Sequence, residues 1–586
     1  MSKFSDATFY LAPSGYKEGI LFPQKPLSTN GEIAFTRASS AWRTNIEGQL
    51  EETCYNLLAY SEDFSSGYWL QQNITLTTNT TIAPDGTLTA DKLIPNTTSA
   101  QHQLFGIVNF LGEGVLSFYA KADGYNFVSL GTGGGVAGGT IFFNLTNGTI
   151  SGSASGLIPS IQNVGNGWYR CSLYNPTMGT GSNASYWVVA RQSESISDYV
   201  GNGTSGIFIW GAQLVKGSLP RPYLSTTTRQ NFPRVDYSLG TGTFLLEPQR
   251  TNVVRNSTIV GAAVGNPGTL PTNWAVFNTF SVNVSVSAIG MENGVNYIDL
   301  NFNGTASASD VIRLVFEQST QIPASNGQTW SFSLYSKIIA QSAPPSSYQL
   351  RMTERNSSSV YVTSSSSAFI PTSTLTRFTQ TYTLVGGATV SYVVPELEIP
   401  VVSGVSYNFT IRIAQPQMEL GAYTTTPIFT TTSAVTRIAD SFSRGNIYTN
   451  NLVSASGGTW FVSLVNNVAY TRDNASRFGI GDTTALTTNS FYFISDLTGR
   501  LLLFKSVGGT ATRIYDTTTT TTKIAIKWNG STADIFANGT KVVSATAFTA
   551  TALQELIGSV GVPLFIQQMA LWNTPLTDAQ CTDLTL

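Results

Sequence analysis

Two stretches of the chain carry the same short phrases in the same order, and this internal repeat limits the folds that the chain can adopt. The matched phrases are residues 55–58 (YNLL) with 251–254 (TNVV), 117–121 (SFYAK) with 333–337 (SLYSK), and 211–217 (GAQLVKG) with 415–421 (QPQMELG). Because the matches keep one order, they predict two copies of one module, each about 170–200 residues long.

The repeated phrases belong to short runs rich in Val, Ile, Phe, Tyr and Thr, which clusters of Gly, Asn, Ser, Asp and Pro separate. In several runs, such as residues 330–337 (WSFSLYSK), apolar and polar residues alternate as half-buried antiparallel strands require. A helical period is nearly absent, and the best helical candidate is residues 576–584. The chain is therefore predicted to be all-β, with tandem antiparallel β-sandwich (jelly-roll) modules.

From about residue 438 the pattern no longer matches the repeat. Asn529-Gly530 and Asn538-Gly539 predict tight hairpin turns, because Asn-Gly supplies the positive φ angles that such turns need. Three successive strands are therefore expected around these two turns, in a third and different sandwich.

Similar arginine-bearing phrases stand at Arg37, Arg234 and Arg437, and they mark the joints between modules. Because apolar and charged residues recur there at matching places, we interpret the joints as ordered connectors. The predicted parts are an N-terminal segment with connector (1–54), a first sandwich (55–228), a connector (229–251), a second sandwich (252–437) and a C-terminal jelly roll (438–586).

Charged residues make up only 11% of the chain, against about 25% in an average soluble domain. The net charge is −2, and no basic stripe of the kind that displaces counterions from nucleic acid is present. No run reaches the roughly 18 apolar residues of a membrane span. The first residues lack the apolar stretch of a secretory signal, which fits a protein released by cell lysis. We therefore expect neither nucleic-acid binding nor membrane insertion.

Cysteine and histidine are too scarce for several kinds of site. Cys54, Cys171 and Cys581 are widely spaced, which predicts neither a disulfide framework nor a zinc motif. His102 is the single histidine, so multi-histidine metal sites are excluded and a catalytic triad has one base available. We interpret His102 as a surface or turn residue.

Paired carboxylates are the remaining catalytic option, because glycoside hydrolysis needs two of them about 5–10 Å apart. The acidic clusters, Glu47, Glu51 and Glu52 in one and Glu62 and Asp63 in the other, are interpreted as solvated connector residues. Residues 438–586 contain no Glu-x-Asp-x-x-Glu string of a jelly-roll glucanase. A non-enzymatic protein without catalytic or cofactor-binding residues is therefore predicted.

Exposed aromatic side chains commonly stack on sugar rings, so the tryptophans are candidates for sugar contact. Core packing is the stronger interpretation for each one, and Trp210 and Trp528 lie in alternating strands that predict a core position. The sequence therefore leaves the ligand-binding residues unknown. The tryptophans considered are Trp69, Trp168, Trp187, Trp210, Trp274, Trp330, Trp460, Trp528 and Trp572.

Two resemblances extend these predictions. The C-terminal part contains, in this order, residues 523–530 (KIAIKWNG), 534–540 (DIFANGT) and 569–580 (MALWNTPLTDAQ). With these phrases it resembles the concanavalin-like, laminin-G type jelly roll. Earlier parts contain residues 12–19 (APSGYKEG), 35–40 (FTRASS), 55–64 (YNLLAYSEDF), 83–87 (APDGT) and 209–214 (IWGAQL). With these phrases, and with the second copy included, most of the chain resembles bacteriophage fibre or appendage proteins with carbohydrate-binding-like sandwiches.

The resemblances imply a structural component on the virion surface, a tail or head fibre or appendage whose sandwiches bind host or environmental polysaccharide during adsorption. Two alternatives stay open: a purely structural head-fibre, collar or decoration protein with sandwich spacers, and a polysaccharide depolymerase. The N-terminal segment is expected to dock to other virion proteins. A homo-oligomer, taken as a trimer, is expected. No cofactor is expected, although the jelly-roll resemblance allows a structural calcium ion.

Overall fold

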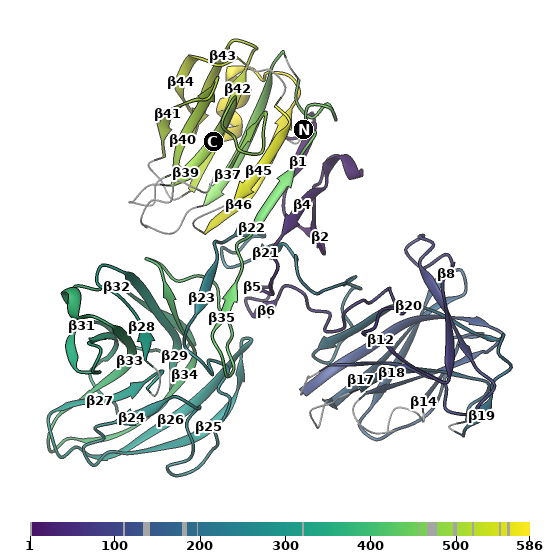
Figure 1. Ribbon diagram of the computed structural model, residues 1–586, viewed down its shortest axis with the longest axis horizontal. Helices are drawn as coiled ribbons and strands as arrows, with labels where there is room; N and C mark the ends of the chain where they lie inside the picture. Colours follow the sequence, from purple (N-terminus) through teal and green to yellow (C-terminus); the bar gives the residue numbers. More distant parts are fainter. Residues whose placement is uncertain are drawn as a thin grey trace. The chain divides into compact units, whose positions relative to one another are not determined.

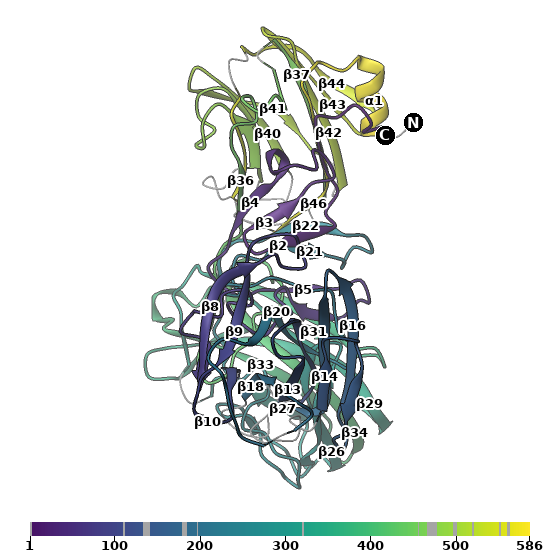
Figure 2. The ribbon, with the colours of Figure 1, turned by 90° about the vertical axis from the view of Figure 1, so that its right-hand side faces the viewer.

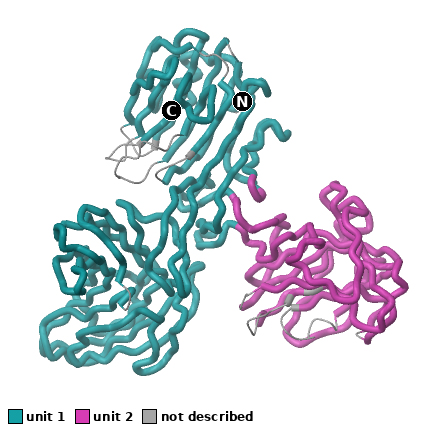
Figure 3. The backbone as a smooth tube through the Cα atoms, in the orientation of Figure 1, with its two compact units in different colours: residues 1–16, 20–53, 233–586 teal, residues 17–19, 54–232 magenta. Residues whose placement is uncertain are grey.

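The computed structural model confirms the predicted all-β fold, with a single short α-helix among the described residues (Figure 1). The backbone forms two compact units (Figure 3). Unit 1 comprises residues 1–16, 20–53 and 233–586, and unit 2 comprises residues 17–19 and 54–232. The structure describes residues 3–108, 112–132, 141–178, 185–195, 197–318, 321–454, 456–465, 478–495, 501–517, 521–549, 553–559 and 563–586.

Unit 2 holds the first sandwich, in which two six-stranded antiparallel sheets enclose one apolar core. One sheet has the order β15-β14-β13-β18-β11-β7 and the other β16-β17-β12-β20-β9-β8; β10 and β19 form a separate pair. The strands are β7 (Leu70–Gln72), β8 (Ile74–Thr81), β9 (Ala90–Pro95), β10 (Ser99–Ala100), β11 (Gln103–Ile107), β12 (Gly112–Asp123), β13 (Phe127–Thr132), β14 (Ile141–Asn144), β15 (Ile150–Gly152), β16 (Ile158–Gly165), β17 (Trp168–Met178), β18 (Ser185–Arg191), β19 (Tyr199–Val200) and β20 (Gly206–Lys216).

The second sandwich has the same strand order. Its sheets run β31-β30-β33-β27-β24 and β32-β29-β34-β26-β25, strand for strand as in the first sandwich without β15 and β16, while β28 adds a short pairing to β33. The strands are β24 (Ala275–Phe277), β25 (Asn283–Glu292), β26 (Val295–Thr305), β27 (Asp310–Val315), β28 (Ile322–Pro323), β29 (Thr329–Ala343), β30 (Tyr348–Arg355), β31 (Tyr361–Phe369), β32 (Thr376–Thr383), β33 (Tyr392–Val401) and β34 (Ser406–Leu420). The repeat predicted from the sequence is therefore a repeat of topology.

A single buried asparagine closes each copy and explains why the phrase YNLL recurs as TNVV. Asn56 Nδ2 donates to Ala212 O and Leu224 O, both at 3.0 Å, and its Oδ1 accepts from the N–H groups of Leu58 and Leu214. In the second sandwich Asn252 makes the same four bonds. Its Nδ2 donates to Pro416 O and Ile428 O, and its Oδ1 accepts from Val254 N and Met418 N. We call this arrangement the clamp.

The C-terminal sandwich draws strands from three distant parts of the chain. One sheet runs β21-β22-β46-β37-β42-β43-β44 with β1 also paired to β46, and the other runs β2-β3-β4-β36-β45-β38-β39-β40-β41. Its strands from residues 438–586 are β36 (Ser441–Arg444), β37 (Gly458–Val465), β38 (Phe478–Gly481), β39 (Ser490–Ser495), β40 (Leu501–Val507), β41 (Thr510–Asp516), β42 (Thr521–Trp528), β43 (Thr532–Ala537), β44 (Thr540–Ala547), β45 (Glu555–Ser559) and β46 (Leu564–Trp572). Those from earlier residues are β1 (Phe9–Leu11), β2 (Gly15–Lys17), β3 (Ile20–Phe22), β4 (Ile33–Thr36), β21 (Arg234–Asp236) and β22 (Thr243–Leu246).

This composition differs from the predicted division, which set residues 1–54 and 229–251 apart from the jelly roll at 438–586. Phe9 and Phe244 are fully buried in the same core as Trp460 and Ile566. β1 pairs with β46 across more than five hundred residues of sequence, and strands of three or four residues carry no local signal of a partner so distant. Both chain ends lie on this sandwich (Figure 2), where Lys3 Nζ donates to Asp583 O at 2.6 Å.

The local predictions for the C-terminal part agree with the structure. α1 (Asp578–Thr585) begins after Thr577, whose side chain accepts from Gln580 N in a capping box. The two Asn-Gly turns join β42 to β43 and β43 to β44, and Asn538 and Gly539 have φ angles of 45° and 79°. The glycine-rich residues 133–139, which the sequence suggests as a loop, lie outside the described residues.

The three arginines of the joints meet in one buried cluster within unit 1, as ordered connectors would. Arg37 Nη1 donates to Asp440 Oδ1 at 2.8 Å, and Arg234 pairs with both Asp440 and Glu247. Arg437 Nη1 lies 2.8 Å from Glu247 Oε2, and all five side chains are almost fully buried. The short pairs β5 (Trp42–Thr44) with β6 (Leu50–Glu52) and β23 (Arg250–Asn252) with β35 (Val435–Arg437) flank this joint cluster.

Candidate functional site

The outer face of one sheet of the second sandwich, opposite the core, carries a groove of about 620 Å³. The sheet pairing brings its polar residues together: Arg351 on β30 lies directly opposite Glu396 on β33, and Arg313 on β27 lies opposite Glu398. The alternate residues of these strands, such as Leu350 and Leu397, face the core. The lining residues are Phe277, Asn278, Arg313, Val315, Gln318, Gln321, Arg351, Thr353, Arg355, Tyr361, Val394 and Glu396.

Four buried polar atoms in this groove have no hydrogen-bond partner among the described residues. They are Gln321 Oε1, Arg351 Nε, Thr353 Oγ1 and Glu396 Oε2. Glu396 and Thr353 are each 2% exposed. Buried polar groups are normally bonded, and leaving one unpaired costs about 1–3 kcal/mol, so a cluster of four marks a place built to receive hydrogen-bonding groups.

The charged side chains of the groove hold one another in place without using all their hydrogen bonds. Glu398, beneath the groove, accepts from Arg313 Nε at 2.9 Å and from Arg351 Nη1. Glu396 Oε2 lies 3.8 Å from the Nε atoms of Arg313 and Arg351, beyond hydrogen-bonding distance. Burial raises the pKa of Glu396, and the two arginines oppose that rise. Glu396 therefore keeps an accepting oxygen free toward the groove.

An exposed aromatic side chain stands at each edge of the sheet. Phe277 on β24 is 40% exposed and Tyr361 on β31 is 54% exposed, and both line the groove. β24 and β31 are the two outer strands of the sheet, so four strand spacings, roughly 19 Å, separate them. The groove thus crosses the sheet between two aromatic platforms.

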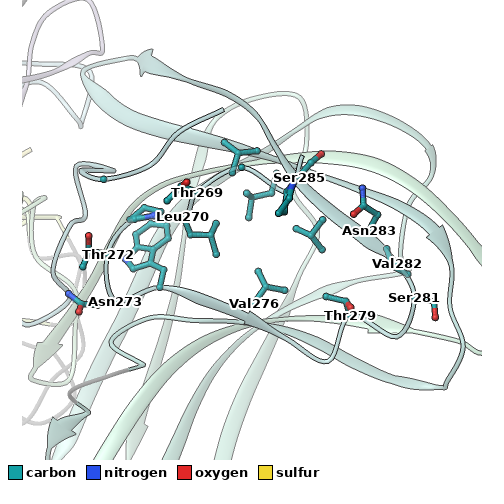
Figure 4. Close-up of a pocket in the computed structure, with 18 residues that line it drawn as sticks. Thr269, Leu270, Thr272, Asn273, Val276, Thr279, Ser281, Val282, Asn283 and Ser285 are labelled. Atoms are coloured by element: carbon teal, nitrogen blue, oxygen red, sulfur yellow. The ribbon is translucent and has the colours of Figure 1, made fainter. Parts of the chain in front are cut away.

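A second cavity of about 860 Å³ lies in the same sandwich, between the loop at residues 261–274 and β25 (Figure 4). Leu270, Val276 and Val282 border it, together with the hydroxyl and amide groups of residues such as Thr269 and Asn283. None of its lining residues is charged, and none contributes a buried side-chain polar atom that lacks a partner within the described part of the chain. This cavity therefore has fewer charged and unpaired polar groups for a polar ligand than the groove has.

The aromatic and acidic candidates predicted from the sequence have structural positions. Eight of the nine candidate tryptophans are buried, including Trp210 and Trp528 as predicted. The side chain of the ninth, Trp187, lies outside the described residues. Glu51 pairs with Arg43 at 2.7 Å, and Glu62 accepts from Tyr223 at 3.0 Å. The two acidic clusters lie in different units.

His102 is not a surface residue, contrary to the sequence-based interpretation. Its side chain is fully buried, and its ring nitrogens contact Asn73 O at 2.5 Å and Tyr199 O at 2.8 Å. The polar sequence around it, Ser-Ala-Gln-His-Gln, gave no sign that two backbone carbonyls would satisfy a buried imidazole. The three cysteines are free and buried, as expected.

The tryptophans and acidic pairs that are candidates in the sequence do not include the groove residues. Their signal is charge at alternate positions of a strand, as in Glu396 and Glu398, within a chain that has few charges. Arg351 and Arg355, four residues apart on β30, show the same period of two. Which face of the strand such residues occupy becomes clear only from the sheet pairing.

The described residues offer no candidate site for a metal ion and no membrane-spanning helix. No group of three or more His, Cys, Asp or Glu side chains is placed there to hold a metal ion. None of the described helices has the length and apolar character needed to cross a membrane.

No family model and no curated protein sequence matches the chain. Among solved structures, it is similar to a CBM4 module (19% identity, covering 28% of this chain and 99% of that one, TM-score 0.20). It is also similar to the CBM22-1–CBM22-2 tandem domain of Xyn10C from Paenibacillus barcinonensis (11%, 62% and 97%, TM-score 0.21). The third is the tripod from the baseplate of bacteriophage Tuc2009 (12%, 49% and 98%, TM-score 0.18).

Proposed function

We propose that this protein is a non-catalytic saccharide-binding protein and that the groove of the second sandwich is its binding site. The observation that carries the proposal is the meeting of unpaired buried polar atoms with exposed aromatic side chains in one groove. A sugar ring has apolar C–H faces and a rim of hydroxyl groups that both donate and accept. Binding sites for such ligands combine apolar surface with a few placed polar groups, as this groove does.

The unpaired atoms are complementary to neighbouring hydroxyl groups. The Arg351 guanidinium can donate to a sugar oxygen, and the Glu396 carboxylate can accept a hydrogen bond from the same or the next hydroxyl. Hydrogen bonds that involve an ionised partner are the stronger ones, which favours this pair as the anchor. Tyr361 and Phe277 would then stack on rings at the two ends of a bound chain.

The test compares the full-length protein with a double variant, Phe277→Ala with Tyr361→Ala, on an array of immobilised bacterial and plant polysaccharides. Loss of both platforms is expected to weaken binding by at least 10-fold, since about 1.4 kcal/mol corresponds to 10-fold in affinity. Tyr448→Ala, which removes an aromatic side chain exposed outside the groove, is the matched control and should bind as the wild type does. Wild-type binding to no polysaccharide would overturn the proposal.

The resemblance of the sequence to phage fibre proteins supports a second part of the proposal. The protein would be a component of a virion surface, with host polysaccharide as its ligand and with the N-terminal segment as one contact to other virion proteins. A trimer is proposed on the same resemblance, and sedimentation of the purified chain measures it. Detection of the chain in purified particles, and inhibition of adsorption by the free protein, would support this setting; its absence from particles would contradict it.

A polysaccharide depolymerase is the rival function, and one observation favours it. The groove contains a carboxyl group, Glu396, whose pKa burial raises, as the general acid of a glycosidase requires. The second carboxyl group, Glu398, does not line the groove and is held by two arginines. Binding without cleavage is therefore the better supported function. New reducing ends formed by the wild type, but not by Glu396→Gln, would reverse this choice.

A further inference from the structure

The groove concentrates positive charge in a protein that has little of it. The whole chain of 586 residues contains 31 lysines and arginines, yet three arginines line this one groove with a single carboxylate. Arg313, Arg351 and Arg355 come from two strands of the same sheet. Counting the underlying Glu398 as well, the five side chains have a formal charge of +1.

The charge is not evenly neutralised along the groove. Glu398 accepts hydrogen bonds from Arg313 Nε and from Arg351 Nη1. The N–H donors without a carboxylate partner therefore lie toward Arg355. Among the described residues, the Arg355 guanidinium makes one hydrogen bond, from Nη1 to Ser359 O at 2.9 Å. The other N–H groups of Arg355 are therefore available to a ligand, and the buried Nε of Arg351 has no partner among the described residues.

We propose that the saccharide bound in the groove carries carboxylate groups, and that the guanidinium groups of Arg355 and Arg351 recognise them. This inference rests on the proposed function, because it names the class of saccharide that the same groove takes. A planar guanidinium presents paired N–H donors that match a carboxylate, and the bond is charge-assisted. The groove already shows this pairing between its own arginines and Glu398.

The position of Glu396 limits which acid can enter. Its carboxylate lies opposite Arg351, while Arg355 lies opposite Tyr392, two rows further along β33. A ligand carboxylate at Arg355 thus lies further along the sheet from Glu396 than one at Arg351 would, although Arg355 still interacts electrostatically with Glu396. A doubly charged phosphate ester would be repelled more strongly by Glu396 than a singly charged carboxylate.

The spacing of the two arginines suits a polymer. Arg351 and Arg355 are four residues apart on one strand, which corresponds to roughly 13 Å. At that backbone spacing, acidic groups that recur along a polysaccharide can meet both guanidinium groups. An acidic polysaccharide can therefore contact more of the groove's arginines than a single acidic sugar can.

The experiment measures binding of the full-length protein to three acidic polysaccharides, polygalacturonate, alginate and hyaluronan, each paired with its carboxyl-reduced neutral form. Reduction removes the charge and keeps the ring hydroxyls. At least one acidic member should bind 10-fold or more tightly than its neutral partner, and added salt should reduce that preference because it screens charge. Titration calorimetry measures both affinities.

Variants connect the preference to the groove. Arg355→Gln should reduce the acidic-to-neutral ratio to near one, whereas Arg355→Lys, which keeps the charge, should retain part of it. Arg513→Gln removes an exposed arginine of β41 and is the control for net charge; it should leave the ratio unchanged. Unchanged melting temperatures would show that each variant folds.

The outcomes separate the two proposals. Equal or tighter binding of the neutral forms by the wild type would overturn the acidic ligand and leave saccharide binding in the groove intact. An acidic preference that survives in Arg355→Gln would also overturn it, since the recognition would then lie elsewhere. Binding of none of the six polymers would contradict this inference, and binding of other glycans on the array would still support the proposed function.

Discussion

The first and second sandwiches have the same strand order and differ on the outer face of one sheet. Val188 lies opposite Leu104 and Leu130 in the first, as Leu397 lies opposite Leu314 and Leu350 in the second, which sets the two registers in correspondence. These pairings belong to the ladders β11–β18, β13–β18, β27–β33 and β30–β33. The core rows are thus equivalent, and the outer rows can be compared position by position.

At four equivalent outer positions the second sandwich has charges and the first has none. Glu396 corresponds to the position of Trp187, and Arg351 to Gly131. Likewise, Glu398 corresponds to Val189 and Arg313 to Gln103. At these described positions the charged groove residues of the second sandwich therefore have no charged equivalents in the first, so one scaffold can keep its core and change its outer face.

A second difference lies where the last strand leaves each sandwich. Thr426 N donates to Glu247 Oε1 at 2.9 Å, and its hydroxyl contacts Arg234 and Arg437 of the joint cluster. The clamp places Pro222 at the equivalent position of the first sandwich, and proline has neither a hydroxyl nor an N–H group. The exit of the second sandwich is thus tied to the joint cluster by hydrogen bonds that Pro222 cannot make.

The clamp is the strongest test of what the two copies have in common. Asn56→Ala and Asn252→Ala each leave two N–H and two carbonyl groups unpaired in a buried place. At about 1 kcal/mol or more for each group, both variants should lose about 4 kcal/mol of unfolding free energy. Calorimetry of the full chain, with hydrogen exchange to assign each transition, should show that each variant affects its own sandwich.

The control for these variants is Asn303→Ala, which truncates an exposed asparagine on β26 and should change stability little. If Asn252→Ala destabilised the second sandwich no more than Asn303→Ala does, the clamp would not be the element that closes each copy.

The joint cluster should make unit 1 sensitive to acid. Burial favours the neutral form of Glu247, but Arg437 and Arg234 outweigh burial and lower the pKa of Glu247 to about 2. A carboxyl group with a depressed pKa stabilises the folded state above its ordinary value near 4.5, and the contribution is lost as pH falls toward 2. At about 1.4 kcal/mol per pH unit, the loss is about 3 kcal/mol.

Urea unfolding of the full chain at pH 5 and pH 3 measures this effect, with Glu247→Gln as the comparison. The wild-type transition of unit 1 should move to lower urea at pH 3, and the variant should lack most of that shift. A shift of equal size in Glu247→Gln would assign the acid sensitivity to other carboxylates.

The sequence was informative about local structure and about the repeat. The strand runs, the Asn-Gly turns and the capped helix at Thr577 are properties of neighbouring residues, and all three are found. The place of β1 and β22 in the C-terminal sandwich was not predictable in this way, because their pairing with β46 depends on contacts hundreds of residues apart. The groove was missed for the same reason: Arg351 and Glu396 meet only when β30 and β33 pair.

The smallest expected difference concerns an arginine that both copies use at the same place. Arg170 and Arg377 each lie about 5.6–5.7 Å from a tyrosine ring, Tyr119 or Tyr335. Arg377 makes three hydrogen bonds, two to Ser333 Oγ and one to Thr425 O. Arg170 Nη2 makes two, and its buried Nε has no partner among the described residues.

Substitution by lysine keeps the charge and removes the planar fork, so its cost should follow the number of bonds lost. Arg377→Lys should therefore destabilise the second sandwich by about 2 kcal/mol, and Arg170→Lys the first by about 1 kcal/mol. Denaturant midpoints of the two assigned transitions compare the variants directly. Equal losses would mean that the contact with the tyrosine ring, which both copies make, determines the role of this arginine, and that the extra bonds of Arg377 contribute little.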